Sequence, residues 1–219
     1  MNSQVLREYL SYFLEGALVT VRVAAVGIAA SLAIGLVCAI VRYLEAPVAK
    51  RAVGLYIELS RNTPLIVQLF FIYYGLPKAG VVLSSEASAI IGLSFLGGGY
   101  MAEAFRSGFD SVGAIQWESA QSLGMTRVNA MAHVIVPQAL SRSVAALVAN
   151  VVFLIKETSV VSVVALNDLV YVAREKIGND YDTTEALVLL VAFYIAIILP
   201  VSLAGACLER RVRRAEFGN

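Results

Sequence analysis

Five apolar stretches, each about 20 residues long, dominate this sequence of 219 residues. They cover approximately residues 18–41, 53–76, 87–106, 142–165 and 185–207. A helix of about 20 apolar residues crosses the roughly 30 Å of hydrocarbon in a bilayer, and lipid leaves no other partner for the backbone polar groups. Hydrophobic residues make up 59% of the chain and charged residues 15%. The sequence therefore predicts an all-α integral membrane protein with five transmembrane helices.

No internal repeat or low-complexity linker separates these stretches, so a single transmembrane domain over residues 1–219 is predicted. The first stretch begins near Leu18 without a basic segment before it or an A-x-A site after it, so we expect an anchor and not a cleaved leader. Cys38 and Cys207 lie inside apolar stretches, which favours small buried hydrophobes over a disulfide or a metal site. No basic stripe indicates a nucleic-acid partner.

The basic residues between the stretches predict the orientation, because cytoplasmic loops carry the excess of lysine and arginine. With the amino terminus outside, one side holds Arg42, Lys50, Arg51, Arg106, Arg127, Arg142, Arg210, Arg211, Arg213 and Arg214. The other side holds Arg7, Lys78, Arg174 and Lys176. We therefore expect the amino terminus outside and the carboxyl terminus in the cytoplasm.

A polar segment, residues 116–137, interrupts the apolar pattern between the third and fourth stretches. Gly124 is the residue that most readily adopts the left-handed conformation ending a helix, and Thr126 can cap a second short helix. Pro137 is expected to stop that second helix. The segment predicts two short helices at an angle, forming a rigid surface knob on the cytoplasmic side that another protein can contact.

The spacing in this segment resembles the EAA loop of ATP-binding-cassette (ABC) importer permeases, whose pattern is E-A-A, three residues, G, nine residues and I-x-L-P. Glu118, Ser119 and Ala120 stand at E-A-A, and Gly124 and Pro137 stand at the glycine and the proline. Ser119, Val134 and Val136 depart from the pattern. The resemblance implies that the loop docks into a groove of a separate ATPase subunit. Its implied coupling residues are Trp117, Glu118, Ser119, Ala120, Gly124 and Pro137, although Trp117 equally fits an interfacial belt.

The second stretch contains Arg61-Asn62-Thr63-Pro64. Proline lacks a backbone donor and disfavours helical geometry in the preceding residue, so a kink or broken turn is expected here. Irregular backbone in a membrane is tolerated only against protein or a water-filled cavity. Arg61 fits either such a cavity or an anchor at the interface. In the third stretch, Gly97-Gly98-Gly99 predicts close packing of helices.

The fourth stretch carries Asn150, Lys156 and Glu157. A charge in hydrocarbon costs at least about 2.5 kcal/mol, so these side chains are expected inside the protein. Asn150 and Glu157 share a helical face, and Lys156 lies about 100° away from Glu157. One interpretation places them along a solute pathway. The other makes Lys156 and Glu157 an internal ion pair, or pairs them with Glu103 or Arg61.

The resemblance narrows when these stretches are compared with the polar amino-acid uptake branch of the same family. Residues 61–77, RNTPLIVQLFFIYYGLP, resemble that branch's R-G-T-P-L-L-V-Q-L-F…Y-x-G-L-P signature, with Asn62 in place of glycine. YMAEAFR at 100–106 and KETS at 156–159 resemble its A-Y-x-x-E-x-x-R and K-D-T-S runs. The implied fold is that of a type I ABC importer permease, with the EAA loop between helices 3 and 4. The pathway residues so indicated are Arg61, Thr63, Gln68, Tyr100, Glu103, Asn150, Lys156, Glu157, Thr158 and Ser159.

The chain is therefore expected to be the permease subunit of an importer for a polar amino acid in a bacterial cytoplasmic membrane. It contains no G-x-x-x-x-G-K-[ST] motif, so it is not itself an ATPase, and no cofactor is expected in it. The resemblance implies an ATPase dimer that holds ATP and Mg²⁺, a second permease chain, an extracytoplasmic solute-binding protein and membrane lipid as partners. The alternatives are an ion-coupled secondary transporter or channel, with Glu103, Lys156 and Glu157 as a relay, and a membrane scaffold that carries nothing.

Overall fold

The computed structural model describes residues 3–44 and 47–217, which form helices joined by short connections and contain no strand in this described part. The long helices are α1 (Ser3–Tyr43), α2 (Pro47–Asn62), α4 (Ser85–Ser111), α7 (Val136–Glu157) and α9 (Thr183–Phe217). The short ones are α3 (Leu65–Phe70), α5 (Ala114–Ser122), α6 (Arg127–Ala130) and α8 (Leu169–Asp180). A π turn (Phe71–Gly75) and a 3₁₀ turn (Leu76–Ala79) extend α3, a π turn (Met131–Ile135) joins α6 to α7, and a 3₁₀ turn (Thr158–Val164) extends α7.

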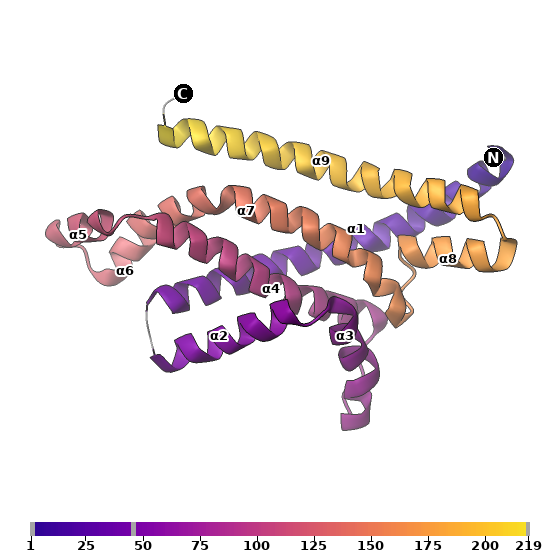
Figure 1. Cartoon of the computed structure of the whole chain (residues 1–219), viewed down its shortest axis with the longest axis horizontal. Helices are drawn as coiled ribbons and strands as arrows, with labels where there is room; N and C mark the ends of the chain where they lie inside the picture. The colour runs from indigo at the N-terminus through magenta and orange to yellow at the C-terminus, as the bar shows by residue number, and fades with distance from the viewer. Residues whose placement is uncertain (1–2, 45–46, 218–219) are drawn as a thin grey trace.

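The long helices lie side by side around α4, which packs against α1, α2 and α7 (Figure 1). One end of the bundle, here the α5–α6 end, holds α5, α6 and the carboxyl end of α9 (Figure 1). The opposite end, the α8 end, holds α8 and the amino end of α1, whose Phe13 packs with Leu169 and Ala173 of α8. The segment after α2 turns away from the bundle (Figure 1).

Among the described residues, three helical segments are long and apolar enough to cross a membrane, namely Gln4–Tyr43, Arg127–Val164 and Thr183–Val212. The first and third of them contain the predicted first and fifth spans, and the second contains all but the last residue of the predicted fourth span. The predicted second span is broken between α2 and α3, which leaves the shorter apolar helix Leu65–Ala79. α4 contains the whole predicted third span but is not among the three. The all-helical, apolar architecture agrees with the prediction, and the count of five spans stays a prediction.

Close packing around α4 depends on the glycines at 97–99, as the sequence predicted. A Cβ on Gly97 would collide with Ser31 of α1, one on Gly98 with the Tyr56 hydroxyl of α2, and one on Gly99 with a side chain of α2. Ser31 Oγ in turn donates to the carbonyl oxygen of Gly27 at 2.7 Å, so its polar group is satisfied inside α1. The missing side chains thus allow the backbones of three helices to approach one another.

The prediction that Pro137 stops a helix is wrong. The helix that starts at Arg127 continues through the π turn Met131–Ile135 into α7, and Pro137 lies in the first turn of α7. In a first turn the missing N–H of proline needs no partner within the helix, and a π turn directly before it changes the hydrogen-bond register. The result is one continuous helical segment from the α5–α6 end toward the α8 end.

Asp168 joins α8 to the rest of the bundle. It is fully buried, and its Oδ1 accepts a hydrogen bond from the Tyr171 N–H at 2.9 Å, which caps the amino end of α8. The N–H of Leu169, the residue directly after Asp168, donates to Thr20 Oγ1 of α1 at 3.2 Å. Burial raises the pKa of Asp168 to about 6, although backbone N–H groups act in the opposite direction.

A methyl group at position 97 tests the packing. We expect Gly97→Ala to destabilise the purified protein by about 1–3 kcal/mol, because the added carbon enters space occupied by Ser31 and Leu154. Gly54→Ala is the matched control, because its Cβ would meet nothing within 4 Å and alanine favours a helix. Thermal unfolding in detergent measures both variants. Equal melting temperatures for the two would contradict the packing role.

Candidate functional site

The predicted break between α2 and α3 is present at Thr63–Pro64. The buried side chain of Gln68 stabilises it, because its Nε2 donates to the carbonyl oxygens of Ser60 and Thr63, both at 3.0 Å. These two carbonyls lie at the break, so Gln68 replaces hydrogen bonds that the interrupted helix cannot make. Gln68 was predicted to contact solute, but its Nε2 is used by the backbone.

A cavity of about 400 Å³, here called the Glu157 cavity, opens beside this break. It is bounded by the break, by α4, and by α7 with its 3₁₀ extension. Its lining residues are Arg61, Asn62, Thr63, Pro64, Leu65, Ile66, Leu96, Tyr100, Phe153, Glu157 and Val160. Glu157 is half-buried, and within the described chain no ion pair or hydrogen bond holds its carboxylate. The cavity thus offers one acidic and one basic side chain among aromatic and aliphatic walls.

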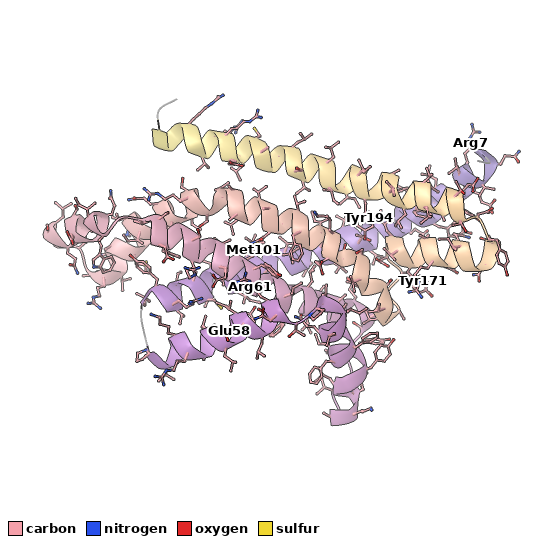
Figure 2. The ribbon with its side chains drawn as sticks, in the orientation of Figure 1. Arg7, Glu58, Arg61, Met101, Tyr171 and Tyr194 are labelled. Atoms are coloured by element: carbon pink, nitrogen blue, oxygen red, sulfur yellow. The ribbon has the colours of Figure 1, made fainter. Side chains whose placement is uncertain are left out.

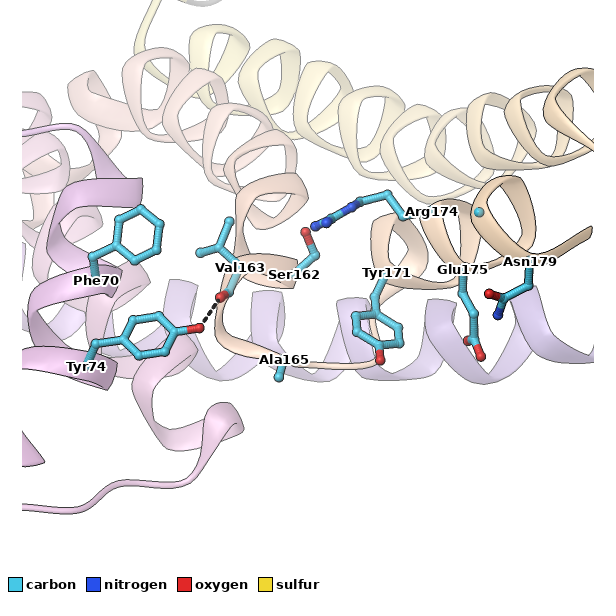
Figure 3. A pocket seen from close by; sticks show the side chains of 10 residues that line it. Phe70, Tyr74, Ser162, Val163, Ala165, Tyr171, Arg174, Glu175 and Asn179 are labelled. Atoms are coloured by element: carbon cyan, nitrogen blue, oxygen red, sulfur yellow. Dashed lines mark hydrogen bonds between the residues drawn. The ribbon is translucent and has the colours of Figure 1, made fainter. Parts of the chain in front are cut away.

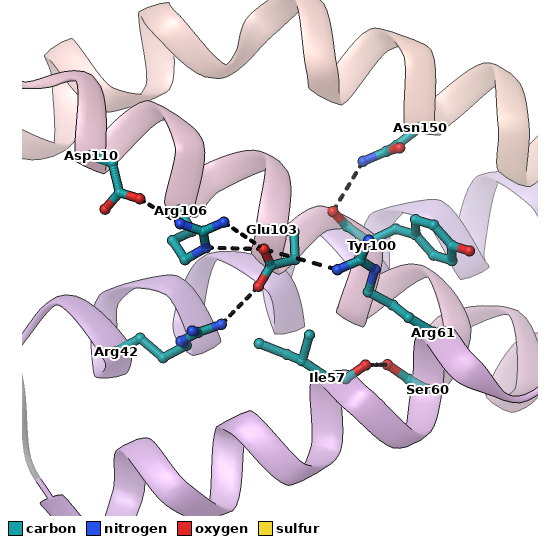
Figure 4. A network of polar contacts seen from close by, with 9 residues as sticks. All are labelled: Arg42, Ile57, Ser60, Arg61, Tyr100, Glu103, Arg106, Asp110 and Asn150. Carbon is teal, nitrogen blue, oxygen red and sulfur yellow. Dashed lines mark hydrogen bonds and ion pairs between the residues drawn. The ribbon is translucent and has the colours of Figure 1, made fainter.

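Glu103 of α4 lies at the centre of a charged network (Figure 4). Its Oε1 is 2.7 Å from Nη1 of Arg42 on α1, and its Oε2 is 2.8 Å from Nη2 of Arg106 on α4. Arg61 of α2 is a weaker partner, with Nη1 at 3.9 Å from Oε2. Arg106 also bonds Asp110 at 2.5 Å. One carboxylate therefore ties three helices together, and its partners are arginines, not the Lys156 that one interpretation of the sequence offered.

Beside this network lies a second cavity of about 420 Å³, the Glu103 cavity. It is lined by the carboxyl end of α1, by α2 and by α4, through Arg42, Gly54, Ile57, Glu58, Arg61, Asn62, Tyr100 and Glu103. Figure 2 shows Glu58 and Arg61 on the same helix of the bundle. Of the pathway residues predicted from the sequence, Thr63 and Glu157 line the first cavity, Glu103 lines the second, and Arg61 and Tyr100 line both.

Asn150 of α7 contributes to packing between helices. Its Nδ2 donates to the carbonyl oxygen of Tyr100 at 3.0 Å (Figure 4), and the rings of Tyr100 and Phe153 lie 4.9 Å apart. These contacts hold α7 against α4 near both cavities. Asn150 lines neither cavity, whereas Glu157, seven residues later on the same helix, lines the Glu157 cavity.

The remaining residues of the KETS run lie away from the cavities. Lys156 is exposed and makes no ion pair, with Glu157 or with any other residue in the described ranges. Thr158 is buried and donates from Oγ1 to the carbonyl oxygen of Ile155 at 2.6 Å, and Ser159 is half-buried. Sequence reasoning missed the walls formed by Phe153 and Val160. Their helical spacing from Glu157, four residues before and three after, was the available signal.

The polar segment forms the α5–α6 hairpin, residues 114–130. Gly124 has φ of +76°, and Thr126 Oγ1 accepts from the Asn129 N–H at 3.3 Å, so the predicted helix end and cap are both present. Glu118, Ser119 and Gly124 are exposed, Ala120 is buried, and Trp117 packs at the edge of the core. Pro137 is also exposed, beyond the π turn. The hairpin carries exposed apolar side chains at Ile115, Leu123 and Val128.

The family model described as "Binding-protein-dependent transport system inner membrane component" matches residues 31–214. The chain belongs to this family. It is therefore a multi-pass permease of the inner membrane, and ATP hydrolysis resides in a partner subunit.

Relatives and solved structures agree with this assignment. The permease is 33% identical, over 94% of its length and 95% of the relative, to the probable glutamine ABC transporter permease protein GlnP of Bacillus subtilis. It is 30% identical to the glutamine transport system permease protein GlnP of Escherichia coli K12, over 91% of this chain and 92% of that one. A crystal structure titled as an amino acid ABC transporter with histidines matches with a TM-score of 0.88 and 30% identity, over 96% and 99% of the two chains.

A further cavity of about 650 Å³ lies between α3 and α8, and none of the predicted site residues lines it (Figure 3). Tyr74 Oη donates to the carbonyl oxygen of Val163 at 3.0 Å and so links the α3 segment to the 3₁₀ turn after α7. Arg174 and Glu175 of α8 line the opposite wall. In the described part of the permease, no group of three or more histidine, cysteine or acidic side chains is arranged to hold a metal ion.

Removing the central carboxylate tests the network of Figure 4. We expect Glu103→Ala to destabilise the permease by about 3 kcal/mol, because Arg42 and Arg106 would lose their shared partner in a partly buried site. Glu86→Ala on the same helix is the control, because its ion pair with Arg22 is exposed and contributes about 0–1 kcal/mol. Chemical unfolding of the purified permease measures both. A smaller loss for Glu103→Ala than for Glu86→Ala would contradict the role given to Glu103.

Proposed function

We propose that this permease forms the translocation pathway for a polar amino acid, with the Glu157 cavity as part of that pathway. The observation that carries the proposal is the presence of Glu157 and Arg61 on the walls of one cavity of about 400 Å³. An amino acid has an ammonium and a carboxylate group, which these opposite charges complement. The names of the relatives, which refer to glutamine and to amino acids, support the same substrate class.

We further propose five spans, formed by α1, by α2 with α3, by α4, by α7 and by α9, with the α5–α6 hairpin as the coupling loop between the third and fourth. The amino terminus would lie outside and the carboxyl terminus in the cytoplasm. The arrangement supports this orientation, because the hairpin and the carboxyl end of α9 with its arginines lie at the same end of the bundle (Figure 1).

The α5–α6 hairpin is the proposed docking site for the ATPase dimer, which would hold ATP and Mg²⁺. Trp117, Glu118, Ser119, Ala120 and Gly124 form or shape its surface, and Pro137 lies where the hairpin joins the fourth span. The continuous helix Arg127–Val164 supports coupling to the pathway, because it contains both the second arm of the hairpin and Glu157. Movement of the docked ATPase would then reach the cavity through a single rigid element.

The remaining partners are also proposals. A second permease chain, identical or different, would complete the pathway, because the α2–α3 break, α4 and α7 leave the Glu157 cavity open. An extracytoplasmic solute-binding protein would deliver the amino acid at the α8 end. The relay alternative has less support, since Lys156 is exposed while Glu103 and Glu157 line different cavities.

Neutralising the acid of the cavity tests the substrate site. We expect Glu157→Gln to raise the KM for uptake about tenfold, because a neutral amide loses a charge-assisted contact with the substrate ammonium group. Uptake of glutamine and of other polar amino acids into proteoliposomes containing the complete transporter measures this. Glu86→Gln, an exposed glutamate on α4, is the control and should leave KM unchanged. Unchanged KM in Glu157→Gln for every amino acid transported would refute the proposed contact.

Distorting the hairpin tests the docking site. We expect Gly124→Pro to lower substrate-stimulated ATPase activity about tenfold, because proline cannot adopt the positive φ of Gly124 and the two arms would change their angle. Gly124→Asn is the control, because asparagine tolerates this conformation. The assay uses the transporter reconstituted with its ATPase and binding protein. Normal stimulation in the proline variant would refute docking at this hairpin.

A further inference from the structure

The Glu157 cavity and the Glu103 cavity share three lining residues, Arg61, Asn62 and Tyr100. The shared residues form the wall between two spaces of similar size, about 400 and 420 Å³. Within this wall, the guanidinium carbon of Arg61 lies 5.2 Å from the centre of the Tyr100 ring. This contact is a cation–π stack between the end of α2 and the middle of α4, seen beside Glu103 in Figure 4.

Arg61 is held more loosely than its neighbours. Its 3.9 Å separation from Glu103 is the longest of the three arginine contacts to that carboxylate. Arg42 and Arg106 occupy both carboxylate oxygens at 2.7 and 2.8 Å. If Arg61 moves away, Glu103 therefore keeps two close partners. The energetic cost of moving Arg61 is small compared with that of moving either other arginine.

The backbone beside Arg61 is also suited to movement. Arg61 belongs to the last turn of α2, directly before the break at Thr63–Pro64. Helix ends and breaks are the positions where changes in φ and ψ between rigid elements are absorbed. A change in the angle between α2 and α3 would shift Arg61 relative to Tyr100, which is fixed on α4 by the Asn150 bond to its carbonyl oxygen.

We propose that the Arg61–Tyr100 stack is a movable barrier between the two cavities. In the closed arrangement Arg61 contacts Tyr100 and Glu103. In the open arrangement it leaves both, and its guanidinium binds the carboxylate of the amino acid passing through the Glu157 cavity. The second half of this statement rests on the proposed function, whereas the barrier itself does not.

The barrier is tested by the reactivity of a cysteine placed behind it. In a background of Cys38→Ala and Cys207→Ser, Val160→Cys places a thiol in the Glu157 cavity, and Gly54→Cys places one in the Glu103 cavity, where a Cβ has free space. The full transporter, in vesicles that expose the α5–α6 end, is treated with the anionic reagent 2-sulfonatoethyl methanethiosulfonate. We expect Arg61→Gln and Tyr100→Leu each to speed modification of Val160→Cys about tenfold. Loss of the Arg61 charge would by itself slow an anionic reagent, so a faster rate reports the opened wall.

Two controls separate the barrier from general loosening. Arg42→Gln removes a closer partner of the same carboxylate but leaves the stack intact, and it should not speed modification of Val160→Cys. Tyr100→Phe keeps the ring and should resemble the parent. The rate at Gly54→Cys shows that each variant is assembled, and it should not rise in any of them. Arg61→Gln and Arg42→Gln should lower it, because both arginines line the same cavity and attract the anionic reagent. If Arg61→Gln does not assemble, Tyr100→Leu decides.

Unchanged reactivity of Val160→Cys in the variants that lack the stack would overturn the barrier, and so would an equal increase in Arg42→Gln. The contact between Arg61 and a substrate carboxylate is measured separately, by uptake of labelled glutamine. Unlabelled glutamine and its decarboxylated analogue 4-aminobutanamide are compared as competitors. With Arg61 present, glutamine should compete at least about tenfold better than the analogue, and in Arg61→Gln this preference should disappear. An intact preference in Arg61→Gln would overturn the carboxylate contact. It would not bear on the barrier, which the modification rate of Val160→Cys tests by itself.

Discussion

Glu103 is the charge on which the arrangement of α1, α2 and α4 depends. A carboxylate at this partly buried position is acceptable because arginines from three helices approach it, and two of them contact it at 2.8 Å or less. The same contacts neutralise Arg42 and Arg106, which would otherwise be costly next to a membrane. The network therefore sets the spacing of the three helices at Glu103. About one turn earlier along α4, the glycines at 97–99 allow the same helices to approach one another. Both cavities lie in the space that these two constraints leave beside α4.

The break after α2 shows how much of this site could be predicted from sequence. Pro64 is sufficient to predict an interrupted helix, because the missing donor and the restricted preceding residue are local effects. How the interruption is stabilised depends on tertiary structure. Gln68 bonds the freed carbonyls, and Asn150 bonds the carbonyl of Tyr100, so the amide nitrogens of two residues predicted for the pathway donate to backbone in this structure. A buried amide is the same residue type in either role, and only the position of neighbouring helices distinguishes the two.

The bounds of the helices also depend partly on local sequence and partly on the rest of the structure. Hydropathy placed the first apolar stretch at residue 18, but α1 begins at Ser3, because helical hydrogen bonds continue where the side chains become polar. For side-chain direction, the helical face of Glu157 was predicted from residue spacing, and Glu157 lines a cavity. Lys156, one residue earlier, points elsewhere and is exposed. Periodicity separates the two directions but does not say which of them is toward the protein interior, since both residues are charged.

The continuation of the helix through Pro137 has a mechanical consequence. A helix that ended at Pro137 would join the hairpin to the rest of α7 through a flexible connection, and displacement at one end would be absorbed there. The π turn before α7 keeps the helix continuous for 38 residues, or about 57 Å at 1.5 Å per residue. A helix of this length transmits rotation and translation from the hairpin to Glu157 with little loss. At the break after α2 the opposite holds, because Arg61 lies on a segment that can change its angle. The two walls of the Glu157 cavity thus differ in stiffness, and a force applied at the hairpin would move Glu157 relative to Arg61.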